Sequence, residues 1–251
     1  MTGGCTKETS QNSMLVVEGY LYANRTLDTI RIAETANGDR PFYPGPVLGA
    51  NVSLETNGVT YKLTGLEGRP GIYTYTGSNL VIKPGVTYHL TVKSGDRALA
   101  AQTVIPSSPP NPALTNDTII ATGTVTPLNI SKTYTLLTWD QTASYTFIMR
   151  KYEEKDTVTI DLPGFGIDHY TPYYLQKPFS GSFAVIPMTD FRYYGTYKFI
   201  ICQVNDDFLK LFEEPGGTQL PGPVQTNIDG GYGIFTGISC DTVTLEVVKG
   251  E

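Results

Sequence analysis

The sequence is poor in charge, histidine and cysteine, and it has no long apolar run. Only 17% of the 251 residues are charged, and Asp plus Glu (24) outnumber Lys plus Arg (18), which leaves a net charge of −6. An acidic chain lacks the basic surface that attracts nucleic acid, so we expect no nucleic-acid partner. Two histidines and three cysteines without a CxxC pair predict neither a metal site nor a cofactor. No run reaches the roughly 18 apolar residues that span a bilayer.

Turn-forming and strand-forming residues are abundant instead. The chain holds 26 Gly, 17 Pro and 17 Tyr, and hydrophobic residues make up 40% of it. Frequent turn residues beside many Thr, Val, Ile and Tyr are typical of all-β proteins. The length allows one large β domain or two of ordinary size.

The N-terminus has the pattern of a lipid-anchored protein. Gly3 and Gly4 stand directly before Cys5, and small residues before a cysteine are what a bacterial lipoprotein signal peptidase accepts. We therefore expect a lipid on Cys5, with residues 1–13 as a tether to the outer membrane. The alternative is an N-terminal leader with an incidental cysteine.

The region 14–105 is expected to form an N-terminal β-sandwich, either immunoglobulin-like or carboxypeptidase-regulatory-like. Short apolar alternations recur along it, and Asn57-Gly58 between two of them is typical of a β-hairpin turn. Seven short strands in about ninety residues favour a sandwich, because a single open sheet would leave an apolar face in water. Several prolines in 106–112 then predict an extended linker.

The region 113–251 is expected to form a second β-sandwich. A strand ending in Trp139-Asp140, followed by a tyrosine-rich strand, resembles a fibronectin-type-III-like sandwich in which the tryptophan fills the core. One short helix is predicted near 205–214, with Phe208, Leu211 and Phe212 on one face. Cys202 and Cys240 form either a disulfide or two buried thiols.

No sequence motif predicts catalysis. The run Gly230-Gly231-Tyr232-Gly233 is followed by strand-like residues, so a structural glycine turn is favoured over a phosphate-binding loop. Asp168-His169 has no second histidine nearby and is interpreted as an ordinary loop. The acidic cluster Glu153-Glu154-Lys155-Asp156 and the pair Asp206-Asp207 lack calcium-loop spacing. We therefore predict no catalytic residues, and no enzyme.

A tyrosine-rich insert in the second domain is the candidate contact surface. Loops usually carry polar residues, so rings at this density either pack as a local core or contact a protein or a glycan. The tyrosines predicted to make such contacts are Tyr170, Tyr173, Tyr174, Tyr193 and Tyr194.

Short motifs along the chain, and above all its closing run, resemble a known family. The run is Asn-Ile-Asp-Gly-Gly-Tyr-Gly-Ile-Phe at 227–235, preceded in order by motifs at 15–19, 45–52, 71–73, 84–88 and 197–199. They resemble an uncharacterised Bacteroidetes envelope lipoprotein family that carries a domain of unknown function. The resemblance implies a cell-envelope lipoprotein, often encoded near outer-membrane transport systems, with no known reaction.

The functional expectation is therefore a non-catalytic, surface-exposed outer-membrane lipoprotein that acts as a binding or accessory module, linked to nutrient uptake through an outer-membrane transporter. One alternative is a structural or adhesive surface protein. A second alternative is a glycan-binding or glycan-hydrolysing protein. Hydrolysis would need two carboxylates about 5–10 Å apart in a cleft, and the sequence indicates no such pair.

Overall fold

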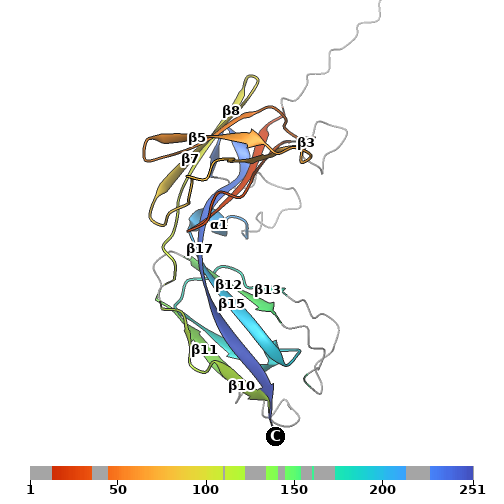
Figure 1. Ribbon diagram of the computed structural model, residues 1–251, viewed down its shortest axis with the longest axis vertical. Helices are drawn as coiled ribbons and strands as arrows, with labels where there is room; N and C mark the ends of the chain where they lie inside the picture. Colours follow the sequence, from red (N-terminus) through yellow and green to blue (C-terminus); the bar gives the residue numbers. More distant parts are fainter. Residues whose placement is uncertain are drawn as a thin grey trace, which may run out of the picture. The chain divides into compact units, whose positions relative to one another are not determined.

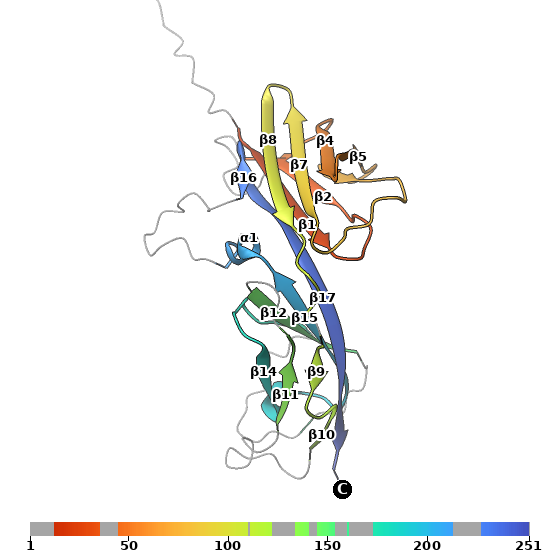
Figure 2. The same ribbon diagram turned by 90° about the vertical axis from the view of Figure 1, so that its left-hand side faces the viewer.

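The protein is built almost entirely from β-strands (Figures 1 and 2). The computed structural model describes residues 13–35, 45–109, 111–121, 134–140, 145–153, 160, 173–212 and 227–250, with only the backbone of residues 173 and 174. Among the helices of this described part, none is long and apolar enough to cross a membrane. The all-β class expected from the composition is confirmed.

The chain divides into two compact units. Unit 1 comprises Met1–Val104 and Glu214–Thr236, and unit 2 comprises Ile105–Glu213 and Gly237–Glu251. The division after Val104 falls one residue from the expected boundary. The division nevertheless differs from the expected pair of consecutive domains, because a late segment of the chain belongs to the first unit.

Unit 1 arranges its strands in the order β17–β1–β2–β6–β5–β4–β7–β8–β16, with β3 beside β2. The strands are β1 (Leu15–Tyr22), β2 (Ile30–Glu34), β3 (Gly45–Pro46), β4 (Asn51–Thr56), β5 (Val59–Gly65), β6 (Ile72–Thr74), β7 (Thr87–Ser94), β8 (Arg97–Val104), β16 (Ile228–Asp229) and the start of β17 (Gly231–Lys249). On β1, β4, β7 and β8 every second residue is buried. Each of these strands therefore turns one face to the core and one to solvent.

The hairpin predicted around Asn57-Gly58 is confirmed. β4 and β5 pair in antiparallel register from Val52–Leu63 to Thr56–Val59. Asn57 and Gly58 both have positive φ, at 50° and 75°, as a tight two-residue hairpin turn requires.

Unit 2 is a sandwich of two sheets. One sheet contains β13 (Tyr173–Leu175), β12 (Tyr145–Tyr152), β15 (Gly195–Val204), the rest of β17 and β10 (Thr118–Ala121); the other contains β14 (Phe183–Pro187), β11 (Tyr134–Thr138) and β9 (Ala113–Leu114). One buried cluster joins residues of both sheets, among them Leu137 and Ile186 from the small sheet and Phe199 and Leu245 from the large one. The two sheets therefore pack face to face over a shared core.

Trp139 lies in this core, as its position at the end of a strand predicted. Its side chain is 3% exposed and meets the ring of Phe179 edge-on, with centroids 5.9 Å apart. Burying so large a ring contributes more to the stability of unit 2 than most single aliphatic side chains do.

The predicted helix exists but is only one turn long. α1 spans Asp206–Leu209, against the expected 205–214. Phe208 is buried and stacks on Phe147, with centroids 5.0 Å apart, whereas Leu211 is exposed and does not share the buried face expected for it. A helix of one turn has too few internal hydrogen bonds to persist alone, so the Phe208 contact holds it in place.

The last strand serves both units. β17 is one continuous strand of 19 residues (Figure 2), where the sequence predicted a glycine turn and a separate strand at 242–247. Its first residues lie beside β1 in unit 1, and its last residues pair in parallel with β10 in unit 2. The divisions between the units therefore fall after Val104, after Glu213 and, within β17, after Thr236.

The shared strand makes unit 1 dependent on the end of the chain. We predict that the segment 13–105 produced alone does not fold stably, because it lacks β16 and the part of β17 that covers β1. Joining residues 227–236 to it through a flexible Gly/Ser linker should restore a cooperative thermal transition measured by circular dichroism. The same fusion carrying Gly233→Val is the control and should stay unfolded; a cooperative transition of 13–105 alone would refute the dependence.

Candidate functional site

The closing glycine run is a structural contact between backbones. A Cβ atom on Gly230 would lie 2.6 Å from the carbonyl oxygen of Ala98, and one on Gly231 would lie 2.7 Å from that of Leu15. A Cβ on Gly233, whose φ is +114°, would collide with the backbone of Val17. Only glycine permits this approach.

The contacts also fix the direction of β17. Gly231 meets Leu15, Gly233 meets Val17, and Phe235 meets Gly19, so the two strands advance in the same direction. Asn227 clamps the same segment, because its side chain accepts a hydrogen bond from the Phe235 N–H and donates one to the Phe235 carbonyl. A strand follows the glycines rather than a helix, so the structural interpretation of the run is confirmed over a phosphate-binding loop.

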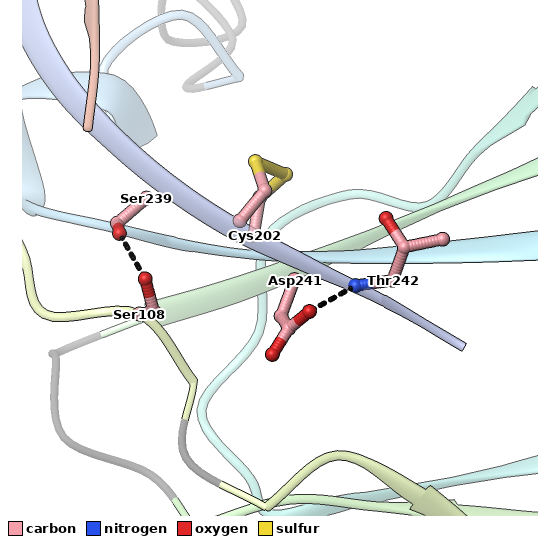
Figure 3. The surroundings of a disulfide bond; sticks show 6 residues. Ser108, Cys202, Ser239, Asp241 and Thr242 are labelled. Atoms are coloured by element: carbon pink, nitrogen blue, oxygen red, sulfur yellow. Dashed lines mark hydrogen bonds between the residues drawn. A yellow bond between two sulfur atoms is a disulfide. The ribbon is translucent and has the colours of Figure 1, made fainter. Parts of the chain in front are cut away.

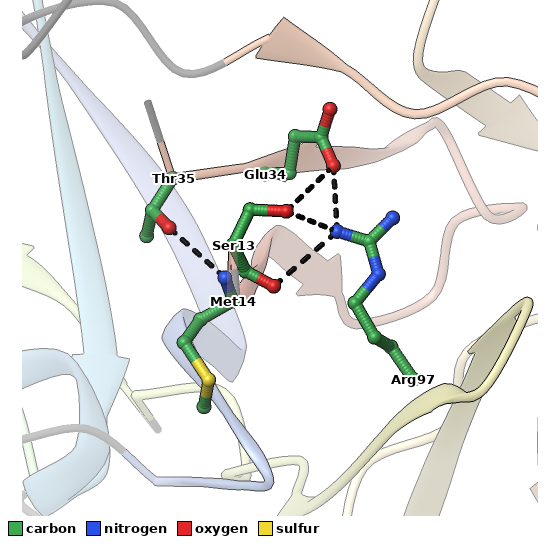
Figure 4. A network of polar contacts seen from close by, with 5 residues as sticks. All are labelled: Ser13, Met14, Glu34, Thr35 and Arg97. Atoms are coloured by element: carbon green, nitrogen blue, oxygen red, sulfur yellow. Dashed lines mark hydrogen bonds and ion pairs between the residues drawn. The ribbon is translucent and has the colours of Figure 1, made fainter. Parts of the chain in front are cut away.

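A polar cluster holds Ser13 and Met14, directly before β1 (Figure 4). Arg97 donates hydrogen bonds to the Ser13 hydroxyl and to Glu34, both at 2.6 Å. Ser13 donates to Glu34 in turn, and the Met14 N–H donates to the Thr35 hydroxyl at 2.9 Å. The cluster therefore fixes Ser13 and Met14 to the neighbouring strands of unit 1.

Cys202 and Cys240 form a disulfide (Figure 3), which decides between the two alternatives left by the sequence. They lie directly opposite each other on β15 and β17. Beside them, the Ser108 and Ser239 hydroxyls are hydrogen-bonded at 2.9 Å. Since the cysteines are separated by 38 residues, the crosslink stabilises unit 2 by about 3–4 kcal/mol in the chain-entropy account.

The predicted contact tyrosines that the structure describes take part in packing. The rings of Tyr152 and Tyr193 stack at 5.4 Å, and the Tyr152 hydroxyl donates to the Tyr194 carbonyl at 2.9 Å. Tyr197 is fully buried, and its hydroxyl donates to the Tyr193 carbonyl at 2.8 Å. Tyr193 and Tyr194 are thus half-buried members of a local aromatic cluster.

The same cluster contains a partly buried ion pair. Arg150 lies 3.1 Å from Asp190 and 5.7 Å from the centre of the Phe191 ring. Burial raises the pKa of Asp190, and the neighbouring Arg150 opposes that rise. The pair fixes the short turn Met188–Asp190 over the core of unit 2.

Several predicted residues lie outside the described part of the chain. They are Cys5, Asp168, His169 and Tyr170. Tyr173 and Tyr174 begin β13, and nothing further is described for them. Among the described residues, no group of three or more His, Cys, Asp and Glu side chains could hold a metal ion.

A surface that the sequence analysis missed is the outer face of the three-stranded sheet. Phe183, Val185 and Tyr134 are 59%, 51% and 50% exposed. The strand register sets Leu136 opposite Val185 and Tyr134 opposite Pro187, so these side chains share one face. We call Tyr134, Leu136, Phe183, Val185 and Pro187 the small-sheet face.

The sequence does contain a pattern that could have revealed the small-sheet face. A strand with one wet side usually alternates apolar and polar residues, whereas Phe183–Pro187 reads Phe-Ala-Val-Ile-Pro and is apolar on both sides. Its inner residues Ala184 and Ile186 pack on the core. The outer ones have no such partner among the described residues, and an apolar face left in water is typical of an interaction site.

Comparison with known families identifies the chain. Residues 6–244 match the family described as "Domain of unknown function (DUF4249)". The chain belongs to this family. The expected membership of an uncharacterised family is thereby confirmed, and the match includes the whole closing run 227–235 that carried the resemblance. Comparison with curated proteins finds no match.

Two solved structures illustrate the fold-level likenesses of this DUF4249 chain. "Crystal structure of DIP-gamma IG1+IG2" has 9% identity and a TM-score of 0.22, covering 96% of this chain and 97% of that one. "Crystal structure of chicken CNTN1 FN1-FN3 domains" has 10% identity and a TM-score of 0.20, covering 93% and 67%. At such scores neither likeness carries an argument about function.

The glycine contact yields a quantitative expectation. We predict that Gly233→Ala destabilises the protein by about 3 kcal/mol or more, because it combines a strained φ with a backbone collision. Gly58→Ala is the matched control, since Gly58 also has positive φ but nothing within 4 Å of its Cβ position. It should cost about 1 kcal/mol. Urea unfolding measures both, and equal losses would refute the close contact.

The polar cluster predicts a pH dependence. The hydrogen bond from Arg97, helped by that from Ser13, lowers the pKa of Glu34. A folded-state pKa below the unfolded one stabilises the protein above the usual glutamate pKa, and this stability is lost as pH falls through the folded-state value. Glu34→Gln should therefore lower the unfolding free energy near neutral pH by less than about 1 kcal/mol, because the pair is a third exposed.

The loss from Glu34→Gln should shrink toward zero as pH falls from about 7 to about 3. Glu18→Gln is the control, since Glu18 forms a longer and more exposed ion pair with Arg31, at 3.4 Å. Urea unfolding across this range measures both variants. A loss from Glu34→Gln that stays constant with pH would contradict the assignment.

Proposed function

We propose that this DUF4249 protein is a non-catalytic cell-envelope lipoprotein, held at the outer membrane by a lipid on Cys5. It serves there as a binding or accessory module, and its partner is part of a nutrient-uptake system. The observation that carries the binding role is the small-sheet face, an uncharged apolar surface on an all-β body.

The disulfide supports the location in the envelope. Disulfides form and persist in oxidising compartments and are rare where thiol reductants act. Cys202 is 2% exposed and Cys240 is half-buried, so the bond is largely shielded from solvent and contributes to the stability of unit 2. A chain stabilised by such a bond is suited to an oxidising compartment outside the cytoplasm.

The polar cluster supports the tether. Arg97, Ser13 and Glu34 fix the chain directly after the segment that separates Cys5 from unit 1. A pull on a lipid at Cys5 would therefore reach the folded body at a hydrogen-bonded point. Because β1 begins immediately afterwards, the cluster protects its first residues from fraying.

The glycan-binding alternative receives less support, because the described tyrosines that were predicted to contact a glycan are engaged in packing. The Tyr193 ring stacks on the Tyr152 ring, and the backbone carbonyl of Tyr193 accepts a hydrogen bond from the Tyr197 hydroxyl. A ring engaged in this way offers less area for stacking on a sugar. Tyr170, Tyr173 and Tyr174 stay a sequence-based prediction.

A structural or adhesive role is the second candidate, and the small-sheet face also favours it. An uncharged apolar face can join copies of one protein as readily as it can join different proteins. The two roles differ in what is found on this face in the cell.

The lipid is tested by producing the chain behind a bacterial lipoprotein signal peptide and labelling the cells with an alkyne fatty acid. We expect labelled protein in the outer-membrane fraction, and loss of the label in Cys5→Ser, because acylation needs the thiol. Cys202→Ala with Cys240→Ala is the control and should stay labelled. Unlabelled protein would overturn the lipoprotein assignment.

The accessory role is tested in the same cells by gentle crosslinking. We expect an outer-membrane barrel protein to be crosslinked to the native chain and to Leu48→Lys, but not to Val185→Lys, which puts a charge on the small-sheet face. Recovery of the native chain only as an uncrosslinked monomer would count against the role.

A further inference from the structure

Among the strands that the structure describes, none covers the outer edge of β14. β14 is the last strand of the sheet β14–β11–β9, and no described strand pairs with its other side (Figure 2). The Trp139 N–H donates to the Ser182 carbonyl at 3.0 Å. Hydrogen-bonded and non-hydrogen-bonded pairs alternate along an antiparallel ladder, so Ala184 and Ile186 bond to β11. Phe183 and Val185 therefore direct their N–H and carbonyl groups away from β11, to the open edge.

The same two residues expose their side chains. Phe183 and Val185 are the most exposed apolar residues of the small-sheet face. The strand Phe183–Pro187 contains no charged residue. Edge strands are ordinarily protected by charges, bulges or prolines near their middle, and here the first two are absent and the only proline stands at the end.

We propose that this edge pairs with the same edge of a second copy of the chain. In an antiparallel pairing about a two-fold axis at Val185, Val185 of each copy exchanges two hydrogen bonds with Val185 of the other. Phe183 of each copy donates to Pro187 of the other. The two three-stranded sheets become one sheet of six strands with a continuous apolar face.

A second copy fits this edge better than an unlike segment of opposite charge. The strand has no charge to complement, and its apolar positions match themselves about the two-fold axis. The chain carries a net charge of −6, so two copies repel each other over most of their surface, but not at this strand. The inference rests on the proposed function and its small-sheet face: the second copy takes the open edge of β14, and the continuous apolar face of the joined sheets stays available to the partner from the uptake system.

The expected affinity is low. Pairing along β14 covers the strand's outer backbone edge and part of Phe183 and Val185 in each copy, so it buries several hundred Å² in all, below the roughly 1,200 Å² of stable interfaces. We therefore expect a dissociation constant on the order of 10⁻⁴ M.

Sedimentation equilibrium from about 10 μM to about 1 mM tests the pairing. The native chain should change from monomer to dimer across this range. Val185→Lys should weaken the association at least about tenfold, because a charge on a paired edge is costly. Leu48→Lys is the matched control, since Leu48 is 70% exposed and lies in unit 1, and it should dimerise like the native chain.

Val185→Pro tests the hydrogen bonds separately. It removes an N–H that points away from β11, so the unfolding temperature should hardly change while the dimer is lost. A native chain that stays monomeric at about 1 mM, or equal dimerisation of Val185→Lys and Leu48→Lys, would overturn the inference.

Failure of the inference is distinct from failure of the proposed function. A monomeric chain that is still labelled at Cys5 and crosslinked to a barrel protein would leave the proposed function intact and remove only the second copy. A chain that dimerises through Val185 but carries no lipid and crosslinks to no barrel protein would leave the dimer intact and overturn the proposed function.

Discussion

The close contact between β17 and β1 determines how the whole chain is organised. A carbonyl oxygen of β1 or β8 occupies the space that a side chain would need at Gly230, Gly231 and Gly233. The contact forms between residues separated by almost the whole length of the chain, so the first unit is complete only after residues 105–213 of the second have been made. Long-range pairing of this kind slows folding, since loop closure precedes any gain from the contact.

β17 is secured differently in each unit. In unit 1 the strand lies too close to β1 for any side chain to intervene, and Asn227 holds Phe235 with two hydrogen bonds. In unit 2 a covalent bond to β15 replaces this shape restriction. One strand thus has a packing constraint in its first part and a chemical one in its second, and substitutions in the two parts should act through different physical causes.

The sequence predicted what local patterns determine. Asn57-Gly58 specified its hairpin because few residue pairs accept two positive φ values, and Trp139 was assigned to the core because a ring of that size is seldom left in water. The helix was overestimated because Leu211 matched the helical spacing without a surface to pack on. The continuity of β17 was missed because glycines signal a turn in sequence, whereas here they allow one backbone to approach another.

The small-sheet face was harder to find, since its meaning depends on neighbours distant in sequence. Val185 and Leu136 are neighbours only after β14 pairs with β11. Nothing in either strand alone says that the outer side stays uncovered. The tyrosine-rich insert attracted attention because rings are conspicuous in a loop, yet its described members turn out to pack on the second core.

An apolar open edge invites unlimited association, and the sheet itself limits it. The opposite edge is β9, a strand of two residues that follows Pro112 and Asn111, the latter at a φ of 52°. Proline and a positive φ prevent a strand from being extended in that direction. Pairing through β14 leaves only the two-residue strand β9 at the other edge of this three-stranded sheet, so association through this sheet closes at a dimer instead of continuing into a fibre. Under the proposed lipid anchor, copies of the chain would share one membrane surface at a higher local concentration than in solution, where a weak, closed contact of this kind becomes effective.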